Sequence, residues 1–423
     1  MIDRIAVENF KSLRRVDLKL GRMNLFIGAN ASGKSNFLEA LRVLQGIGNG
    51  FTISEILDGK PKSATNATWE GVRGGSGYVS FSGIEGNEEV SFNVRGRWDS
   101  PIPWESIGLQ DSRLRSLETW PIWALEISFR PTGGKIVREC FSLEGHTIYR
   151  FTPETDSDQF ANYPANSGTS RSFKIDNRRP ALEQFASLYR HDLFEDCPRE
   201  HPDLAARTGT TLANMQRLDP AFTHLRSYSD APSARRMGDR GENFAALVQS
   251  ICEDEKAKDV YLSWLRELRP EEIDDAGVVY GAVGEPLFIL SENGRDFPAQ
   301  VLSDGTLRFA ALAAALFQPD MPSLLMMEEI ENGIHASRLR LLLELLRGQA
   351  EEAGTQIVAT THSATVLDWL SEEDYKTTFF CKRDEETGES RIRALADVPR
   401  FLDVVKETPA SELFAEGWLE AAP

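Results

Sequence analysis

Apolar and polar residues alternate in two short segments near the start of the chain, residues 2–8 and 14–20. Alternation with a period of two predicts β-strands that each bury one face. The apolar run "MNLFIG" that follows predicts a short buried strand, and the apolar spacing in "KSNFLEALRVLQGI" predicts a helix. We therefore expect two strands, a buried third strand, a glycine-containing loop and a helix within the first fifty residues.

The pattern changes farther along the chain. Short alternating runs between residues 78 and 152, separated by Gly, Pro and Asn, predict an antiparallel meander. Residues 153–180 are rich in Ser, Asn, Asp and Pro and predict an exposed loop or a partly disordered linker, whereas residues 181–270 carry apolar residues at helical spacing. The sequence contains no internal repeat and no heptad run long enough for an extended coiled coil. The pattern predicts three parts, which are residues 1–152, 153–277 and 278–423.

The stretch "FIGANASGKSNF" at residues 26–37 carries the pattern G-x-x-x-x-G-K-[ST], with Gly28, Gly33, Lys34 and Ser35. It lies between the predicted buried strand and the predicted helix, which is the context that a phosphate-binding loop requires. In such a loop the backbone N–H groups and the lysine cradle phosphates, and the serine hydroxyl helps to hold Mg²⁺. The sequence therefore predicts a nucleotide site.

Two further apolar runs end in residues that can carry phosphate chemistry. The run "SLLMMEEIENGIH" ends its predicted strand at Glu328 and Glu329, and such a pair suits a hydrated Mg²⁺ and a general base. We assign Glu328 to the metal and Glu329 to the base; the alternative is a strand that ends in two exposed acids. The run "TQIVATTHS" ends at His362, which can hydrogen-bond the γ-phosphate or the attacking water, or can simply cap the strand.

The segment "VLSDGTLRFAALAAALF" places Ser303, Asp304 and Gly305 just before an apolar helix expected to begin near Thr306. A hydroxyl and a glycine at a helix N-terminus offer O–H and N–H donors and the helix dipole to an anion. The chain carries one phosphate loop, so this second helix end would serve the nucleotide of another subunit. An ordinary N-cap turn is the alternative.

The chain is acidic, with 47 Lys and Arg against 65 Asp and Glu and a net charge of −18. Nucleic acid binds largely through Lys and Arg, so this balance argues against a general DNA-coating protein; simple solubility is the other meaning of the charge. Any DNA contact would need a local basic patch, a dimer groove or a partner. Two clusters are candidates, with solvated loops or intersubunit ion pairs as the alternative: Arg171, Lys174, Arg178 and Arg179, and Arg235, Arg236 and Arg240.

The remaining signals point to a cytoplasmic protein. The four cysteines are far apart and form no C-x-x-C pair, which is typical of reduced thiols. The first residues, "MIDRIAVENFKSL", contain no apolar signal region, and no run of about 18 uncharged apolar residues occurs. The acidic run "KRDEETGES" at residues 382–390 predicts a solvated hairpin tip.

Four motifs in a fixed order carry a resemblance to a known family: "FKSL…IGANASGKSN", "LSDGT", "LLMMEEIENGIH" and "VATTHS". Together they resemble the ATP-binding-cassette ATPases of the RecF/SMC clan, and in particular its stand-alone bacterial "predicted ATPase" branch, an AAA family with a split cassette. The resemblance implies an α/β fold, an ABC-type P-loop ATPase head with a mixed central sheet and an antiparallel β subdomain. Residues 1–152 and 278–423 would form the two halves of the head. Residues 153–277 would form a loop and helical insertion, or lid, between Walker A and the signature motif.

The resemblance also assigns roles to individual residues. Glu328 stands where many cassettes have Asp, Ile330 replaces a common Pro, and the segment around Arg73 is only a candidate for the Q-loop. Ser35 and Glu328 would hold Mg²⁺, and Glu329 and His362 would act in catalysis. The nucleotide-binding residues would be Lys11 and Ser12 near the base and α-phosphate, Gly28, Asn30, Gly33, Lys34, Ser35 and Asn36 in Walker A, Ser303 and Gly305 in the signature, and His335 at the end of the D-loop.

The function that the resemblance implies is an Mg²⁺-dependent ATPase that converts ATP and water to ADP and phosphate. Two chains would dimerise head to tail and sandwich ATP between Walker A of one and the signature of the other, with higher assembly also open. The dimer would control DNA contact or a separate effector, such as a nuclease or toxin, in DNA repair or anti-phage defence. Two alternatives stay open: an ATP-sensing switch or scaffold with little turnover, and the energy subunit of a transporter, for which the segment between Asn36 and Ser303 is too long.

Overall fold

The computed structural model describes residues 1–60, 69–81, 89–98, 121–153, 159–165, 168–188, 197, 200–269 and 271–421. The chain divides into two compact units, and each unit is assembled from stretches that are far apart in the sequence. Unit 1 comprises residues 1–21, 28–215 and 380–394, and unit 2 comprises residues 22–27, 216–379 and 395–423.

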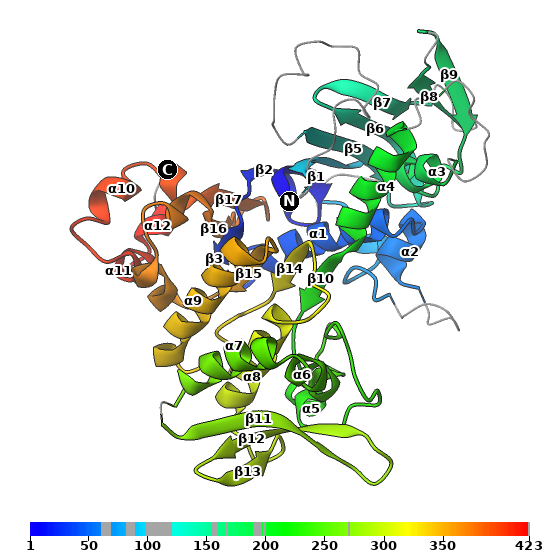
Figure 1. Ribbon diagram of the computed structural model, residues 1–423. Coiled ribbons are helices and arrows are strands. Elements are labelled where there is room, and N and C mark those ends of the chain that lie inside the picture. The colour runs from blue at the N-terminus through cyan, green and yellow to red at the C-terminus, as the bar shows by residue number, and fades with distance from the viewer. Residues whose placement is uncertain are drawn as a thin grey trace. The chain divides into compact units, whose positions relative to one another are not determined.

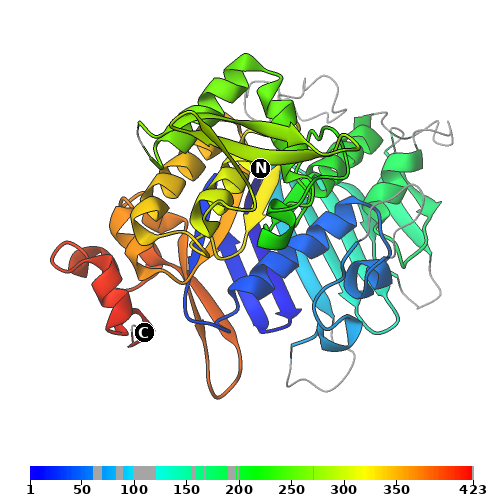
Figure 2. The same ribbon diagram turned by 90° about the horizontal axis from the view of Figure 1, so that it is seen from below.

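Unit 1 is built on an eight-stranded antiparallel sheet with the strand order β2-β1-β4-β5-β6-β7-β8-β9. Helix α1 follows the phosphate loop and lies across this sheet at β1 (Figure 2). The elements of unit 1 are β1 (Ile2–Phe10), β2 (Leu13–Lys19), α1 (Lys34–Gly48), α2 (Ile53–Asp58), the 3₁₀ turn η1 (Ser76–Tyr78), β4 (Val90–Arg97), β5 (Ile122–Arg130), β6 (Lys135–Leu143), β7 (His146–Phe151), β8 (Phe160–Pro164), β9 (Ser170–Lys174), α3 (Ala181–Leu188), α4 (Glu200–Ala213) and β17 (Ser390–Ala394).

The predicted meander is confirmed by strands β4 to β7. In β4 the side chains of Val90, Phe92 and Val94 are buried and the residues between them are not, as the alternating pattern requires. Phe92 packs against Phe129 of β5 with the ring centroids 6.1 Å apart. In the run expected to begin the meander, residues 78–84, Tyr78 ends the 3₁₀ turn η1 and Ser80 forms an isolated antiparallel bridge with Phe10 of β1. Residues 82–84 lie outside the described residues.

The loop predicted for residues 153–180 is wrong over much of its length, because β8 and β9 form a hairpin that extends the sheet. Ala161, Tyr163 and Phe173 are buried, and the rings of Phe173 and Phe185 of α3 lie 5.3 Å apart. Apart from Phe160 and Pro164, the exposed residues of these short strands are polar. Their Ser and Asn content resembles that of a loop. The few apolar residues of the hairpin are buried against residues outside it, such as Phe185, and the local sequence does not reveal these contacts.

A buried carboxylate joins β6 to the first turn of α3. Glu139 is fully buried and accepts hydrogen bonds from Tyr149 Oη at 2.6 Å and from the backbone N–H groups of Ala181 and Leu182 at 2.7 Å each. Burial raises the pKa of Glu139 to about 7, and the three donors oppose this rise. The carboxylate thus caps the helix at the cost of a charge inside the unit.

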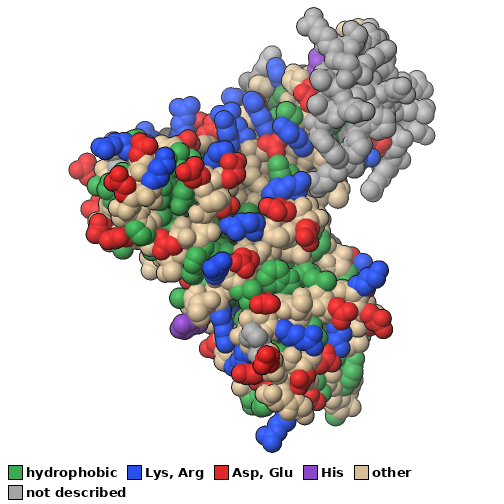
Figure 3. Space-filling view, turned by 60° about the vertical axis from the view of Figure 1, so that its left-hand side comes forward, with side chains coloured by type: hydrophobic (Ala, Val, Ile, Leu, Met, Phe, Trp, Pro, Cys, Tyr) green, Lys and Arg blue, Asp and Glu red, His purple; other side chains and the backbone are tan. Residues whose placement is uncertain are grey.

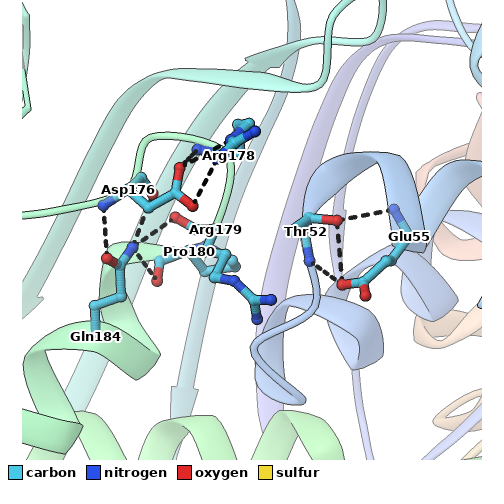
Figure 4. Close-up of polar contacts among 7 residues, drawn as sticks. All are labelled: Thr52, Glu55, Asp176, Arg178, Arg179, Pro180 and Gln184. Carbon is cyan, nitrogen blue, oxygen red and sulfur yellow. Dashed lines mark hydrogen bonds and ion pairs between the residues drawn. The ribbon is translucent and has the colours of Figure 1, made fainter. Parts of the chain in front are cut away.

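Side chains also fix the segment between β9 and α3 and the start of α2 (Figure 4). Gln184 of α3 accepts from the backbone N–H of Asp176 at 2.7 Å and donates to the carbonyl of Arg179 at 3.0 Å. Thr52 and Glu55 form a capping box in which each side chain accepts from the backbone N–H of the other. The contacts of Gln184 thus hold the segment between β9 and α3 in place, within the stretch 153–180 whose composition predicts a loop.

A second, six-stranded sheet has the order β10-β14-β15-β3-β16-β17. The chain passes between the units before and after β3, within β10 (Met215–Leu218), within β16 (Thr378–Arg383) and after β17. In unit 2, β14, β15 and β3 are parallel neighbours, with Met327 opposite Ala359 and Thr361 opposite Ile27. The elements of unit 2 are β3 (Met23–Ile27), α5 (Phe222–Leu225), α6 (Phe244–Cys252), α7 (Glu255–Arg266), β11 (Ile273–Tyr280), β12 (Pro286–Glu292), β13 (Arg295–Pro298), α8 (Asp304–Leu316), β14 (Leu324–Met327), α9 (Ala336–Glu352), β15 (Gln356–Thr361), the 3₁₀ helices η5 (Ala364–Trp369), η6 (Asp374–Lys376) and η7 (Leu395–Asp397), α10 (Phe401–Val404), α11 (Ala410–Ala415) and α12 (Trp418–Ala421).

Helices α6, α7 and α8 pack on one another beside the three-stranded sheet β11-β12-β13 (Figure 1). Helix α8 is almost entirely buried and is lined with alanine and leucine, which allows close packing on several sides. The mixed sheet, the antiparallel sheet and the helices between the phosphate loop and α8 confirm the predicted fold class. Among the helices of the described residues, none combines the length and apolar character needed to span a bilayer.

Candidate functional site

The phosphate loop connects β3 to α1, and its conformation follows from its glycines. Gly33 has a φ of 105°, which favours glycine, and Ala31 has a φ of 61°. Gly33 is the N-cap residue of α1, and within the described residues no side chain caps this helix end. The N–H groups of its first turn therefore point at a position suited to an anion.

Lys34 lies at the centre of this loop and is only 4% exposed. Its Nζ donates to the carbonyls of Gly28 at 2.7 Å and Ala29 at 2.8 Å, so the loop folds around the ammonium group. A bound phosphate would offer the same group stronger, charged acceptors. The lysine is thus held in the cradle where the sequence motif expects it.

Residues from the β16–β17 hairpin support the loop from behind. A Cβ added to Gly28 would overlap the carbonyl oxygen of Cys381, and a Cβ added to Gly33 would overlap the hydroxyl of Ser390. Ser390 is fully buried and donates to Ser12 Oγ at 2.7 Å, and Asn36 Nδ2 donates to the same oxygen at 2.6 Å. The predicted solvated tip at 382–390 is confirmed in its exposed residues, but its last residue is part of the loop's support. Because only glycine fits both positions, the cradle suits a phosphate chain.

The predicted base-side residue Lys11 is drawn toward α1. Its ammonium pairs with the buried carboxylate of Glu39, and it also donates to the carbonyl of Arg73 at 2.9 Å. Arg73 Nε donates to the other oxygen of Glu39 at 2.7 Å, so one carboxylate binds two cations. Sequence reasoning missed Glu39, because a glutamate inside a helical pattern is ordinarily solvated. The Q-loop candidate Arg73 thus belongs to the surroundings of Lys11.

In unit 2, Glu328 and Glu329 directly follow β14, at the carboxyl edge that β14 shares with β15 and β3. Glu328 is mostly buried and pairs with Arg217 of β10, with 3.0 Å between Oε1 and Nη2. Glu329 has a φ of 47°, and its N–H donates to Thr360 Oγ1 at 3.0 Å. A non-glycine residue in this region stores strain, which is common at functional positions.

The same edge holds His362, which follows β15. Its Nε2–H donates to the Glu329 carboxylate at 3.2 Å, and its backbone N–H donates to the carboxylate of Glu331. Side chains of Glu329 and His362 remain 49% and 30% exposed, so both can reach a substrate or water. The acid and imidazole that the sequence assigns to catalysis are therefore a hydrogen-bonded pair. Glu331 was not predicted, since its role depends on a strand 31 residues away.

The signature segment lies against the turn that follows the two acids. Ser303 is the N-cap of α8 and its Oγ accepts from Thr306 N at 3.3 Å, so the helix begins at Asp304. A Cβ on Gly305 would come within 2.8 Å of the Gly333 carbonyl oxygen, which explains the glycine. His335, the predicted D-loop residue, caps α9 by accepting from Ser337 N at 3.3 Å.

Arg308 ties α8 to the acids. It is 2% exposed and donates to the backbone carbonyls of Glu328 at 3.3 Å, Glu329 at 3.4 Å and Pro220 at 3.1 Å. Burial lowers the pKa of its guanidinium. Sequence patterns do not single out Arg308, because an arginine inside an alanine-rich helix belongs to no motif.

The structure brings the site residues together in two groups. Ser12, Gly28, Gly33, Lys34 and Asn36 belong to the cradle of unit 1, together with Asn30 and Ser35 of the same loop. Unit 2 unites the two acids with His362, and the signature glycine with the D-loop turn. Among the described residues no group of three or more His, Cys, Asp or Glu side chains forms a metal cage. A hydrated Mg²⁺ needs none, because it is held by one or two protein oxygens and the phosphates, and the carboxylate of the mostly buried Glu328 is an oxygen ligand of the kind that this ion prefers.

The two basic clusters are largely engaged within the chain. Arg178 pairs with Asp176 at 3.2 Å, Arg235 pairs with Asp320 at 2.8 Å, and Arg236 is partly buried and donates to Gln216 at 3.1 Å. Burial lowers the pKa of Arg236. Acidic and basic side chains are interspersed on the face seen in Figure 3. Arg171 and Lys174 lie on β9 and are exposed.

The chain is similar to several known proteins. A curated protein of Helicobacter pylori named "ATP/GTP phosphatase" is 20% identical over 399 residues, which cover 91% of this chain and 93% of that protein. The SMC head domain from Thermotoga maritima is 11% identical, with a TM-score of 0.44, and the match covers 93% of this chain and 98% of that one. A Pyrococcus furiosus Smc head domain with an extended coiled coil, bound to the C-terminal domain of ScpA, is 12% identical, with a TM-score of 0.49 and coverage of 96% and 99%.

The family assignment comes from the sequence itself. The family described as "AAA domain, putative AbiEii toxin, Type IV TA system" matches residues 23–368, which is most of the chain. The match runs from β3, before the phosphate loop, through both acids to His362 and η5. This chain therefore belongs to that family of AAA ATPases.

Proposed function

We propose that this protein is an Mg²⁺-dependent ATPase whose two nucleotides are sandwiched in a head-to-tail homodimer in the cytoplasm. The observation that carries hydrolysis is the hydrogen bond between Glu329 and His362, on a backbone strained at Glu329. The phosphate loop follows β3, and the acids follow β14, so each group lies directly after a strand, as the motifs require. Family membership supports the nucleotide class.

In the proposed mechanism, the α1 N-terminus and Lys34 bind the phosphates of ATP. Glu328 and Ser35 would hold Mg²⁺, which supplies charge neutralisation at the β- and γ-phosphates when bound. Glu329 accepts a proton from the attacking water, and His362 holds the Glu329 carboxylate while sensing the γ-phosphate. The exposure of the Glu329 and His362 side chains supports this role, because both can reach water and substrate.

The dimer is proposed from the signature segment. Ser303 and Gly305 begin α8 in unit 2, and Gly305 lies against the D-loop turn at Gly333. This arrangement supports a surface that contacts the nucleotide bound to a second copy. Arg308 of α8 would couple this contact to the acids, because it donates to the backbone carbonyls of Glu328 and Glu329. Closure on ATP and opening after hydrolysis would control DNA contact or an effector protein, and the family's description, which names a toxin, supports a role in defence.

The test uses Glu329→Gln, with Glu344→Gln on the exposed face of α9 as the matched control. We expect Glu329→Gln to bind ATP with Mg²⁺, to release phosphate at least about 100-fold more slowly, and to elute as a stable dimer. The control should hydrolyse ATP as the wild type does. A Glu329→Gln protein that stays monomeric at saturating ATP would contradict the dimer. Unchanged phosphate release would contradict the assignment of the base, and slow release by the wild type itself would favour the ATP-sensing switch.

A further inference from the structure

Arg217 lies on β10, the strand next to β14 in the six-stranded sheet, and its position is fixed by its neighbour Gln216. Gln216 is 2% exposed and donates to the Met237 carbonyl at 2.7 Å, while its Oε1 accepts from Gln318 at 2.9 Å. Successive side chains of a strand point to opposite faces. The buried amide network on one face therefore holds Arg217 on the other.

The ion pair between Arg217 and Glu328 joins two side chains that are mostly withdrawn from water. Their exposed fractions are 26% and 15%, and Oε1 of Glu328 lies 3.0 Å from Nη2. The Nε of Arg217 is buried and has no hydrogen-bond partner among the described residues. Through Nη2, the guanidinium is held to the Glu328 carboxylate. A carboxylate in such surroundings needs a cation, because an unpaired buried charge is costly.

We propose that Arg217 is a positioning residue that occupies the metal-facing carboxylate of Glu328 in the nucleotide-free protein and is displaced when Mg²⁺ and nucleotide bind. This inference rests on the proposed function, since it takes Glu328 as the metal-binding residue. It goes further by naming a cation within the chain that competes with the metal.

The competition follows from charge and geometry. Glu328 Oε1 receives the guanidinium, and a divalent ion directed to this carboxylate would repel an arginine that kept the same place. Magnesium binding therefore carries the cost of breaking the Arg217 pair. When no metal is present, Arg217 balances the negative charge of the Glu328 carboxylate. Arg217 thus sets the Mg²⁺ concentration at which nucleotide binds, with no need to touch the reacting atoms.

The experiment measures AMP-PNP binding by calorimetry across a Mg²⁺ titration, and the melting temperature without ligand. In Arg217→Gln we expect the ligand-free melting temperature to fall, because Glu328 loses its partner. We expect the Mg²⁺ midpoint for AMP-PNP binding to fall by about fivefold to tenfold, because the competitor is gone. Arg217→Lys keeps a positive charge and should lie between the wild type and the glutamine variant.

Arg347→Gln is the matched control, because Arg347 forms a 3.0 Å ion pair with Asp374 of similar exposure within unit 2. It should lower the melting temperature and leave the Mg²⁺ midpoint unchanged. An unchanged Mg²⁺ midpoint in Arg217→Gln and Arg217→Lys would overturn the proposal. If the wild type bound AMP-PNP independently of Mg²⁺, or not at all, the proposed function itself would fail, which distinguishes the two results.

Discussion

The buried carboxylate of Glu139 makes stability depend on pH in a way that can be measured. Its pKa is about 7 in the folded chain, against an ordinary value of 4.5. Between these two pKa values, Glu139 is protonated in the folded chain and ionised in the unfolded chain, so protonation favours the folded state. The stabilising contribution is therefore fully present below pH 4.5 and is lost as the pH rises through about 7.

The magnitude follows from the two pKa values. At about 1.4 kcal/mol per pKa unit, the difference amounts to about 3 kcal/mol, of which about 2 kcal/mol falls between pH 5.5 and pH 8. In Glu139→Gln the group cannot ionise, so its contribution should not change with pH. We therefore expect the free energy of unfolding of the wild type to fall by about 2 kcal/mol relative to this variant across that range.

The assay is urea unfolding followed by circular dichroism at several pH values between 5.5 and 8, above the sequence pI near 4.9. Glu126→Gln is the matched control, because Glu126 is an exposed residue of β5 that faces Cys140, the residue after Glu139, across the sheet. Its stability curve should run parallel to that of the wild type. Tyr149→Phe removes a donor that lowers the pKa of Glu139, so its loss of stability should move to higher pH. Parallel curves for the wild type and Glu139→Gln would refute the reasoning and show that the three donors keep the carboxylate ionised.

Two further predictions concern ligands. Gly33→Ala should cost about 1–2 kcal/mol in backbone strain alone, and more from the overlap with Ser390, so we expect a lower melting temperature and weaker binding of a fluorescent ATP analogue; near wild-type binding would contradict the described cradle. If β9 contacts DNA, the double variant Arg171→Glu and Lys174→Glu should weaken binding of a duplex and reduce the slope of log affinity against log salt by about 2, whereas an unchanged slope in fluorescence anisotropy would remove this surface from consideration.

Local sequence patterns predicted most of the helices and strands. The features that they did not predict depend on contacts with strands far away in the sequence. The strand, loop and helix around Lys34 are contiguous, so one stretch of sequence carries both the fold and the chemistry. The contact between Arg217 and Glu328 could not be predicted, because it depends on the order of strands in the sheet. Strands β10 and β14 are neighbours although more than 100 residues separate them. The strained backbone of Glu329 could likewise not be predicted from the sequence, because its N–H donates to Thr360, which lies on another strand. The hairpin β8–β9 was missed because its apolar anchors are few and its partners are nonlocal.

The hydrogen bond between Ser12 and Ser390 joins residues that are 378 positions apart, and it lies directly behind Gly33 of the phosphate loop. During synthesis, the motif that binds nucleotide leaves the ribosome long before the hairpin that braces it. Closing so long a loop is also slow compared with forming the helix beside it. The capacity to bind nucleotide should therefore arise late, when residues near 390 have docked, and this delay would keep an unfinished chain from engaging ATP.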